Sequence, residues 1–110
     1  MAQKKTVNQD IVRVAQRFAN HVQRQGIPVA RTVLFGSWAK GKARKDSDID
    51  ICLVSPQFGK DDLIEMRYLL METMAVDSRI EPIPMSTKDY ETDATPFVLE
   101  IKKYGKIIDI

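Results

Sequence analysis

The sequence is poor in the residues that form disulfides or soft-metal sites, with one cysteine and one histidine in 110 residues. Cys52 lies in an apolar run, so neither a disulfide framework nor a cysteine-based metal site is possible within one chain, and this fits a reducing cytosol. No apolar run approaches the ~18 residues of a membrane span, and the beginning "MAQKKTVNQD" has no apolar segment. We therefore expect a cytoplasmic protein that does not enter a membrane.

The composition and length are those of a small folded domain. Apolar residues make up 44% and charged residues 29% of the chain, which excludes a wholly disordered protein. The length predicts one domain over residues 1–110 with a modest core, so a larger active site would have to be completed by a partner. The net charge of +2 neither requires nor excludes nucleic acid as a ligand.

Apolar periodicity in the first half of the chain predicts one helix and two strands. The spacing of apolar residues favours a helix from Asn8 to Gln25 that ends before Gly26. The short apolar segment Arg31 to Phe35 predicts a first strand, and Asp48 to Val54 predicts a second.

The second half predicts two more helices around a third strand. A helix begins near Asp62 and ends near Ala75, and we expect its buried face to carry Leu63, Met66, Leu70 and Met74. "RIEPIPMS" is typical of a strand that its two prolines push to a sheet edge. Thr95-Pro96 begins a last helix that Gly105 ends, and "KIIDI" predicts a final strand. The order favours an α/β (α+β) fold, a small mixed sheet flanked by helices.

The two aspartates of the second strand are the first candidate functional residues. Side chains alternate along a strand, so Asp48 and Asp50 project from the same face and repel each other unless a cation lies between them. Hard oxygen ligands without cysteine or histidine nearby favour Mg²⁺ or Mn²⁺. Upstream, Gly36 permits a sharp turn, and the segment "SWAKG" after it is long enough for one helical turn with free N–H groups.

This pairing of a glycine-serine turn with two carboxylates predicts a nucleoside triphosphate site. The phosphates would lie at Gly36 and Ser37, with Lys40 and Lys42 adding positive charge, and the metals would lie at the carboxylates. For the basic residues of this loop a solvated surface is the competing interpretation. Trp38 is explained either as a base-stacking residue or as a buried loop anchor, and we favour the anchor.

The stretch "GSWAKGKARKDSDIDI", Gly36 to Ile51, resembles the signature of the DNA polymerase β-like nucleotidyltransferase superfamily, in its minimal nucleotidyltransferase (MNT) branch. The closing segment "EIKKYGKIID" is similar to MNT proteins too. The resemblance implies a polymerase β palm-like fold and two magnesium ions held by the acid pair. It also implies a third carboxylate from a later strand. Glu81 is the best match for that acid, Asp77 is the fallback, and the family commonly has aspartate there.

The same resemblance implies a reaction and a partner. Ser37 would contact the terminal phosphates, Asp48 and Asp50 would hold the metals, and Glu81 would help to activate an incoming hydroxyl that attacks the α-phosphorus of ATP or another NTP. MNT proteins of this kind are antitoxins that transfer AMP to a tyrosine of a HEPN-domain toxin. Three alternatives for the function stay open: this enzyme, a catalytically weak module that neutralises a HEPN partner by occlusion, and a transferase acting on a small molecule or tRNA. A homodimer is also possible, and nucleic acid is not required.

Overall fold

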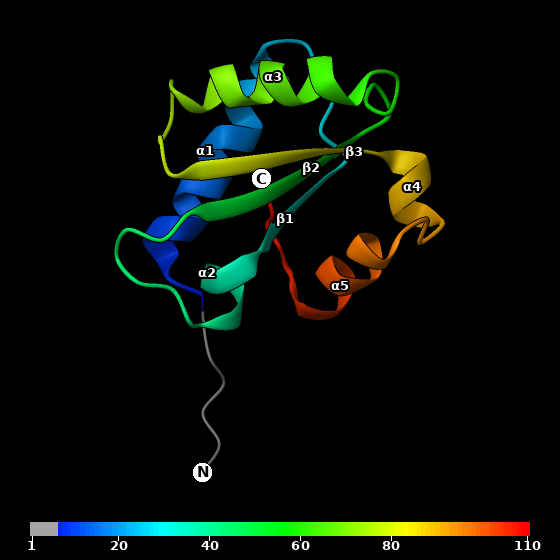
Figure 1. Ribbon diagram of the computed structural model, residues 1–110. Coiled ribbons are helices and arrows are strands. Elements are labelled where there is room, and N and C mark those ends of the chain that lie inside the picture. Colours follow the sequence, from blue (N-terminus) through cyan, green and yellow to red (C-terminus); the bar gives the residue numbers. More distant parts are fainter. Residues whose placement is uncertain (1–6) are drawn as a thin grey trace.

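The computed structural model describes residues 7–110 and contains a four-stranded mixed sheet with the strand order β3-β2-β1-β4 (Figure 1). β1 (Arg31–Phe35) pairs antiparallel with both β2 (Ile49–Ser55) and the short β4 (Lys106–Ile107). β3 (Ile80–Ser86) pairs with β2 in the parallel sense. The predicted mixed sheet is therefore confirmed, and its first three strands lie within one residue of their predicted bounds. The final strand is shorter than "KIIDI" predicted, because it pairs with β1 only at Lys106 and Ile107.

Helices cover both faces of this sheet (Figure 1). Within residues 7–110 they are α1 (Gln9–Arg24), α2 (Gly36–Lys40), α3 (Asp62–Thr73), α4 (Thr87–Glu91) and α5 (Pro96–Tyr104). α1 and α3 pack on one face, and α4 and α5 pack on the other. The predicted turn of helix after Gly36 is confirmed as α2.

The residues at the helix ends explain where the helices begin. Asn8 Oδ1 accepts a hydrogen bond of 2.8 Å from the backbone N–H of Asp10 at the start of α1. Thr95 Oγ1 accepts one from the N–H of Val98, which confirms the predicted cap of α5. α4 was not predicted, although Ser86 and an acid three residues later form a helix-start pattern, and Ser86 Oγ accepts from the N–H of Asp89.

The core lies on both faces of the two central strands. On the α1 side the largest fully buried side chains include Phe18 from α1 and Ile49, Ile51 and Leu53 from β2. On the opposite side Cys52 packs among a second group of buried residues, Val33, Val54, Met85, Val98 and Ile101. Burial raises the pKa of the Cys52 thiol to about 12, so this thiol behaves as a small apolar group.

The predicted buried face of α3 is wrong. Leu63, Leu70 and Met74 are exposed, and Met66 is only half-buried. The side chains that face inward are Leu69 and Thr73. Sequence periodicity could not choose between the two sides, because α3 carries apolar residues on both of them. The helix also ends at Thr73, two residues before the predicted end.

β3 lies at one edge of the sheet, as its prolines predicted. Pro82 and Pro84 pair in register with Ile51 and Leu53 of β2 and have no backbone N–H of their own. α3 packs along the same edge. None of the helices formed by residues 7–110 is long and apolar enough to cross a membrane.

Candidate active site

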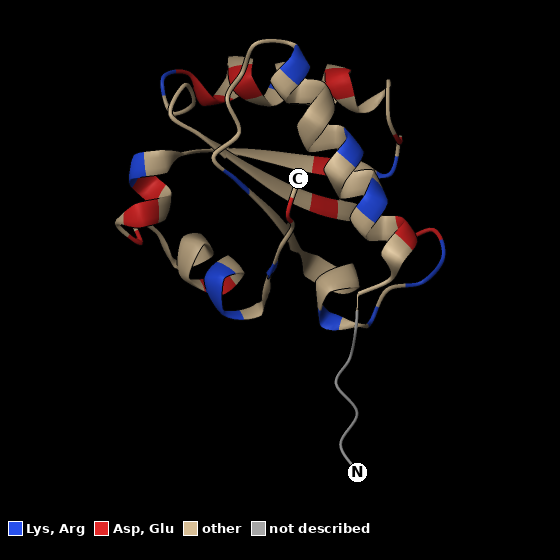
Figure 2. Ribbon diagram, turned by 180° about the vertical axis from the view of Figure 1, so that it is seen from behind, with Lys and Arg blue, Asp and Glu red and all other residues tan. Residues whose placement is uncertain are grey.

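Three carboxylates meet at one end of the β2–β3 pair. Asp50 of β2 is the register partner of Glu81 in the parallel strand β3, so both side chains project from the same face of the sheet. Asp48 precedes β2 by one residue and shares the face of Asp50 because side chains alternate along an extended chain. In Figure 2 the acidic segments of β2 and β3 lie side by side. The structure thus brings together the three predicted acids, on the face of the sheet opposite α1.

Gly36 closes this site from the side of β1. Phe35, the last residue of β1, pairs with Asp50, so the chain turns into α2 directly beside the Asp50 carboxylate. Gly36 has a φ of +73°, which favours glycine. A Cβ atom at Gly36 would lie 2.0 Å from Asp50 Oδ2, closer than any side chain can come. The glycine is therefore required twice, by the backbone conformation and by the carboxylate against it.

The environment of Asp50 disfavours its charged form. Burial, together with the negative charges of Asp48 and Glu81, raises the pKa of Asp50 from 3.8 to about 6. Burial makes the largest contribution. A carboxylate kept half-buried beside two others is stabilised by any cation that binds between them.

The donor set fits a hard divalent cation. Asp48, Asp50 and Glu81 offer only carboxylate oxygens, the ligands that Mg²⁺ and Mn²⁺ prefer. The charge repulsion at Asp50 is what such a cation would relieve. Within residues 7–110, no three acids, histidines or cysteines are already close enough together to form a complete metal site. The carboxylate oxygens thus suit a divalent metal ion, and they supply only part of its coordination shell.

The loop between α2 and β2 is held by its own side chains. Trp38 is half-buried, and its indole N–H donates to the backbone oxygen of Ser47 over 3.2 Å. Ser47 Oγ accepts a hydrogen bond of 2.7 Å from the N–H of Arg44. Trp38 therefore anchors this loop, and Ser47 caps its turn. Ser37 is exposed at the first turn of α2, next to Gly36.

The fallback acid Asp77 is engaged elsewhere. Its two carboxylate oxygens accept hydrogen bonds from the guanidinium of Arg79, at 3.1 Å from Nε and 2.8 Å from Nη2. This bonding lowers the pKa of Asp77. Arg79 also donates to the backbone oxygen of Lys45, so the Asp77–Arg79 pair ties the basic loop to the start of β3. Sequence reasoning missed this tether, whose only signal was an acid and an arginine two residues apart before a strand.

Lys40 and Lys42 point toward the end of the chain. They line a hollow with Lys103, Tyr104 and Lys106, and Lys40 Nζ lies 5.4 Å from the centre of the Tyr104 ring. Neither Gly36 nor Ser37 lines this hollow. Phosphate binding by Lys40 and Lys42 stays a prediction, and the two later lysines were not foreseen.

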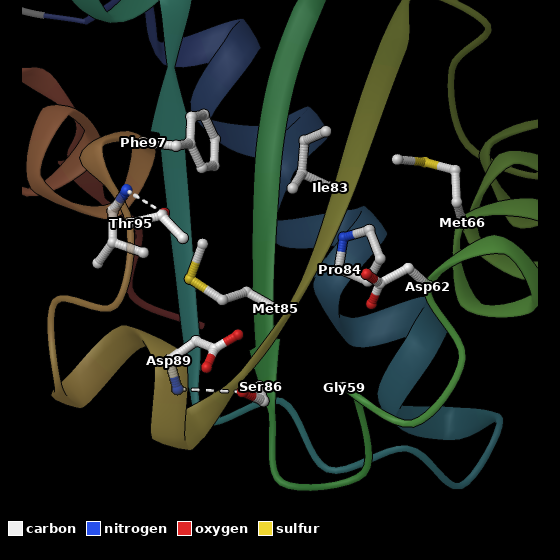
Figure 3. Close-up of a pocket in the computed structure, with 11 residues that line it drawn as sticks. Gly59, Asp62, Met66, Ile83, Pro84, Met85, Ser86, Asp89, Thr95 and Phe97 are labelled. Atoms are coloured by element: carbon white, nitrogen blue, oxygen red, sulfur yellow. Dashed lines mark hydrogen bonds between the residues drawn. The ribbon is translucent and has the colours of Figure 1, made fainter.

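A separate cavity of about 260 Å³ crosses the outer edge of β3 (Figure 3). Asp62 and Met66 of α3 line one side, and Met85 and Phe97 line the other. None of the three clustered carboxylates lines it. The Phe97 ring contacts Phe35 edge-on, with the ring centres 5.2 Å apart, so α5 is fixed against the end of β1 that carries the Gly36 turn.

A protein-family model of the nucleotidyltransferase domain matches residues 15–108, nearly the whole chain. The chain belongs to the nucleotidyltransferase domain family. The match of this domain includes the Gly36 turn, the Asp48 and Asp50 pair and Glu81. A comparison of its sequence with curated proteins returns no match.

Solved structures share the fold of this nucleotidyltransferase domain. A candidate nucleotidyltransferase from Sulfolobus solfataricus is 18% identical, with a TM-score of 0.60 over 97% of this chain and 89% of the other. A toxin–antitoxin structure with AMP-PNP is 24% identical (TM-score 0.56, 83% of this chain and 72% of the other). A complex of tri-AMPylated Shewanella oneidensis HEPN toxin with MNT antitoxin is 22% identical (TM-score 0.51, 86% and 71%). The predicted family and the predicted nucleotidyltransferase fold are thus confirmed.

Proposed function

We propose that this nucleotidyltransferase domain transfers a nucleoside monophosphate, AMP from ATP, to a hydroxyl group. The observation that carries the proposal is the Asp50 carboxylate packed against Gly36, with Asp48 and Glu81 beside it. This arrangement places acids for divalent metals directly next to a tight turn that leaves room for phosphate. We place the reaction in the cytoplasm.

The carboxylates are the proposed metal ligands. Asp48, Asp50 and Glu81 would hold Mg²⁺, with Mn²⁺ as a substitute. When bound, two such ions supply positive charge at the attacking and leaving oxygens of phosphoryl transfer. Without a bound cation the Asp50 carboxyl has a pKa of about 6, and a divalent cation between the acids would lower this pKa by stabilising the ionised form.

The protein's own residues position the substrates. Ser37 and the Gly36 turn hold the terminal phosphates of ATP, and Lys40 and Lys42 add positive charge. The acceptor hydroxyl oxygen attacks the α-phosphorus, forming a new P–O bond. The bond between the α-phosphorus and the α–β bridging oxygen breaks, and pyrophosphate leaves. Glu81, exposed on the edge strand, accepts the hydroxyl proton.

A HEPN-domain toxin is the proposed acceptor and partner. Two of the structural relatives come from toxin–antitoxin complexes, and one of these contains an AMPylated HEPN toxin. Asp48 and Glu81 are exposed, and none of the three acids lines the cavity at β3 or the hollow beside Lys40 and Lys42. An acceptor presented by a second protein suits such an exposed site, and a tyrosine of the toxin meets this requirement.

The test is a transfer assay with matched variants. The protein is incubated with α-³²P-labelled ATP, Mg²⁺ and, as acceptor, the HEPN-domain protein that this proposal expects an adjacent gene to encode. We expect label on a toxin tyrosine with the native protein, and a loss of at least about 100-fold with Asp48→Asn or Asp50→Asn. An Asp46→Asn variant, which removes a loop carboxylate outside the cluster, is the control. Neutralisation of the toxin without any labelling, unchanged in the Asp48→Asn/Asp50→Asn protein, would instead establish occlusion.

A further inference from the structure

Helix α3 carries large apolar side chains on two opposite sides. Leu69 and Thr73 on its inner side are buried against the rest of the protein. Its outer side carries a row of large apolar residues that are 44–79% exposed. This row, called the outer stripe below, consists of Leu63, Ile64, Leu70 and Met71 of α3 and of Met74, which follows its last residue. A surface helix normally presents polar residues on its outer side, so the exposed apolar residues of the outer stripe favour a contact surface.

The members of the outer stripe lie on one side of the helix. At 100° per residue they fall within one third of the helix circumference. Leu70 and Met71 line a shallow hollow with Arg67 and the half-buried Tyr68. An apolar surface of this extent on a small protein marks a contact with another molecule.

A positive charge lies at the middle of the outer stripe. Arg67 falls between Leu63 and Leu70 on the same side of α3, is exposed, and forms no salt bridge with any acid of residues 7–110. If two copies of the chain paired antiparallel through the stripe, their Arg67 residues would meet near the two-fold axis as like charges. A carboxylate on a different protein would pair with Arg67 instead.

We propose that the outer stripe of α3 docks an amphipathic helix of a second protein, with a carboxylate of that helix placed against Arg67. This inference rests on the proposed function, because a small helical HEPN protein offers such a helix. Apolar side chains on both helices would interdigitate, and the central ion pair would set the register of the two helices.

The position of α3 connects this docking surface with the active site. Met66 and Asp62 of α3 line the cavity that crosses the edge of β3, and Ile83 on the far side of the same cavity lies two residues after Glu81 on the same strand face (Figure 3). A partner seated on α3 would have to reach around the edge strand β3, because the carboxylates project from the opposite face of the sheet.

The proposal is tested by calorimetric titration of the intact protein with the HEPN-domain protein that the proposed function expects an adjacent gene to encode. We expect Met71→Glu and Met74→Glu to weaken binding at least about tenfold, because each places a carboxylate in the apolar contact. Leu99→Glu is the matched control, since Leu99 is a large apolar residue on α5 that is 53% exposed and lies outside the stripe. The affinity of the Leu99→Glu variant for the HEPN protein should stay within about twofold of that of the native protein. Arg67→Glu should weaken binding strongly, and Arg67→Lys should largely retain it.

The possible outcomes separate the docking surface from the proposed function. If the native protein binds the HEPN protein and the stripe variants bind equally well, the docking surface is overturned and the proposed partner stands. If the native protein does not bind the HEPN protein, both the docking surface and the proposed partner are overturned. Sedimentation without the partner provides a further check. A native dimer that Met71→Glu converts to a monomer would show that a second copy covers the stripe, and would also overturn the proposal.

Discussion

Replacing Asp50 by asparagine changes the charge of the central carboxyl while keeping its shape beside Gly36. The pKa of Asp50 rises from 3.8 to about 6, so ionised Asp50 destabilises the folded state. A rise of this size corresponds to about 3 kcal/mol for a fully desolvated group. Asp50 is only half-buried, and solvent screening reduces the effect to about 1 kcal/mol. The variant Asp50→Asn should therefore be more stable than the native protein in metal-free buffer.

The raised pKa of Asp50 also predicts how the stability difference between Asp50→Asn and the native protein changes with pH. Because the pKa is raised in the folded state, the stability contributed by protonated Asp50 is fully present below pH 3.8 and is lost as the pH rises through about 6. The advantage of Asp50→Asn should grow between these two values and then stay constant. Above pH 6 it should appear as a rise in Tm of about 4 °C.

The assay is thermal unfolding by circular dichroism at several pH values from 4.5 to 8, with EDTA and then with Mg²⁺. Mg²⁺ should stabilise the native protein and have little effect on Asp50→Asn, because the variant lacks a central ligand. Asp48→Asn is the control for removing one charge at an exposed position of the cluster, and its gain in EDTA should be smaller. If Asp50→Asn were less stable than the native protein at pH 8 in EDTA, the reasoning about its buried charge would be refuted.

Four further substitutions test other parts of the site and the fold. Gly36→Ala should lower the free energy of unfolding by at least about 1 kcal/mol and abolish transfer, because a Cβ there meets Asp50 Oδ2 at 2.0 Å; denaturant unfolding and the transfer assay measure both effects. Glu81→Gln should reduce transfer at least about 100-fold without loss of stability, whereas Asp77→Asn should leave transfer nearly unchanged; the reverse result would make Asp77 the third carboxylate. Thr95→Ala should lower Tm by about 4 °C through loss of the α5 cap, and an unchanged Tm would show that this hydrogen bond contributes nothing.

Local sequence patterns predicted most of the elements because the chemistry that forms them is also local. The cap at Thr95 and the edge position of the proline-containing strand both follow from one or two residues and their backbone groups. α3 could not be oriented in this way. Its two sides are nearly equally apolar, and the choice of Leu69 over Leu70 as a buried residue is made by packing against the rest of the protein.

The candidate site was predictable in its residues and only partly in its geometry. Alternation placed Asp48 and Asp50 on one face, but the register that brings Glu81 beside Asp50 depends on a parallel pairing between distant strands. The contact between Gly36 and Asp50 depends in the same way on the pairing of Phe35 with Asp50. The engagement of Asp77 by Arg79 could not be inferred, because an acid and an arginine two residues apart pair only in some conformations.

The prolines of β3 also limit how this protein can associate. Pro82 and Pro84 are two residues apart, so their backbone positions point the same way, and only the outward direction preserves the ladder to β2. The outer edge therefore lacks two of the donors that an added strand would need. Strand addition at β3, the usual route by which open sheets recruit extended peptides or coalesce into aggregates, is disfavoured, and any partner that reaches Glu81 must do so with its side chains.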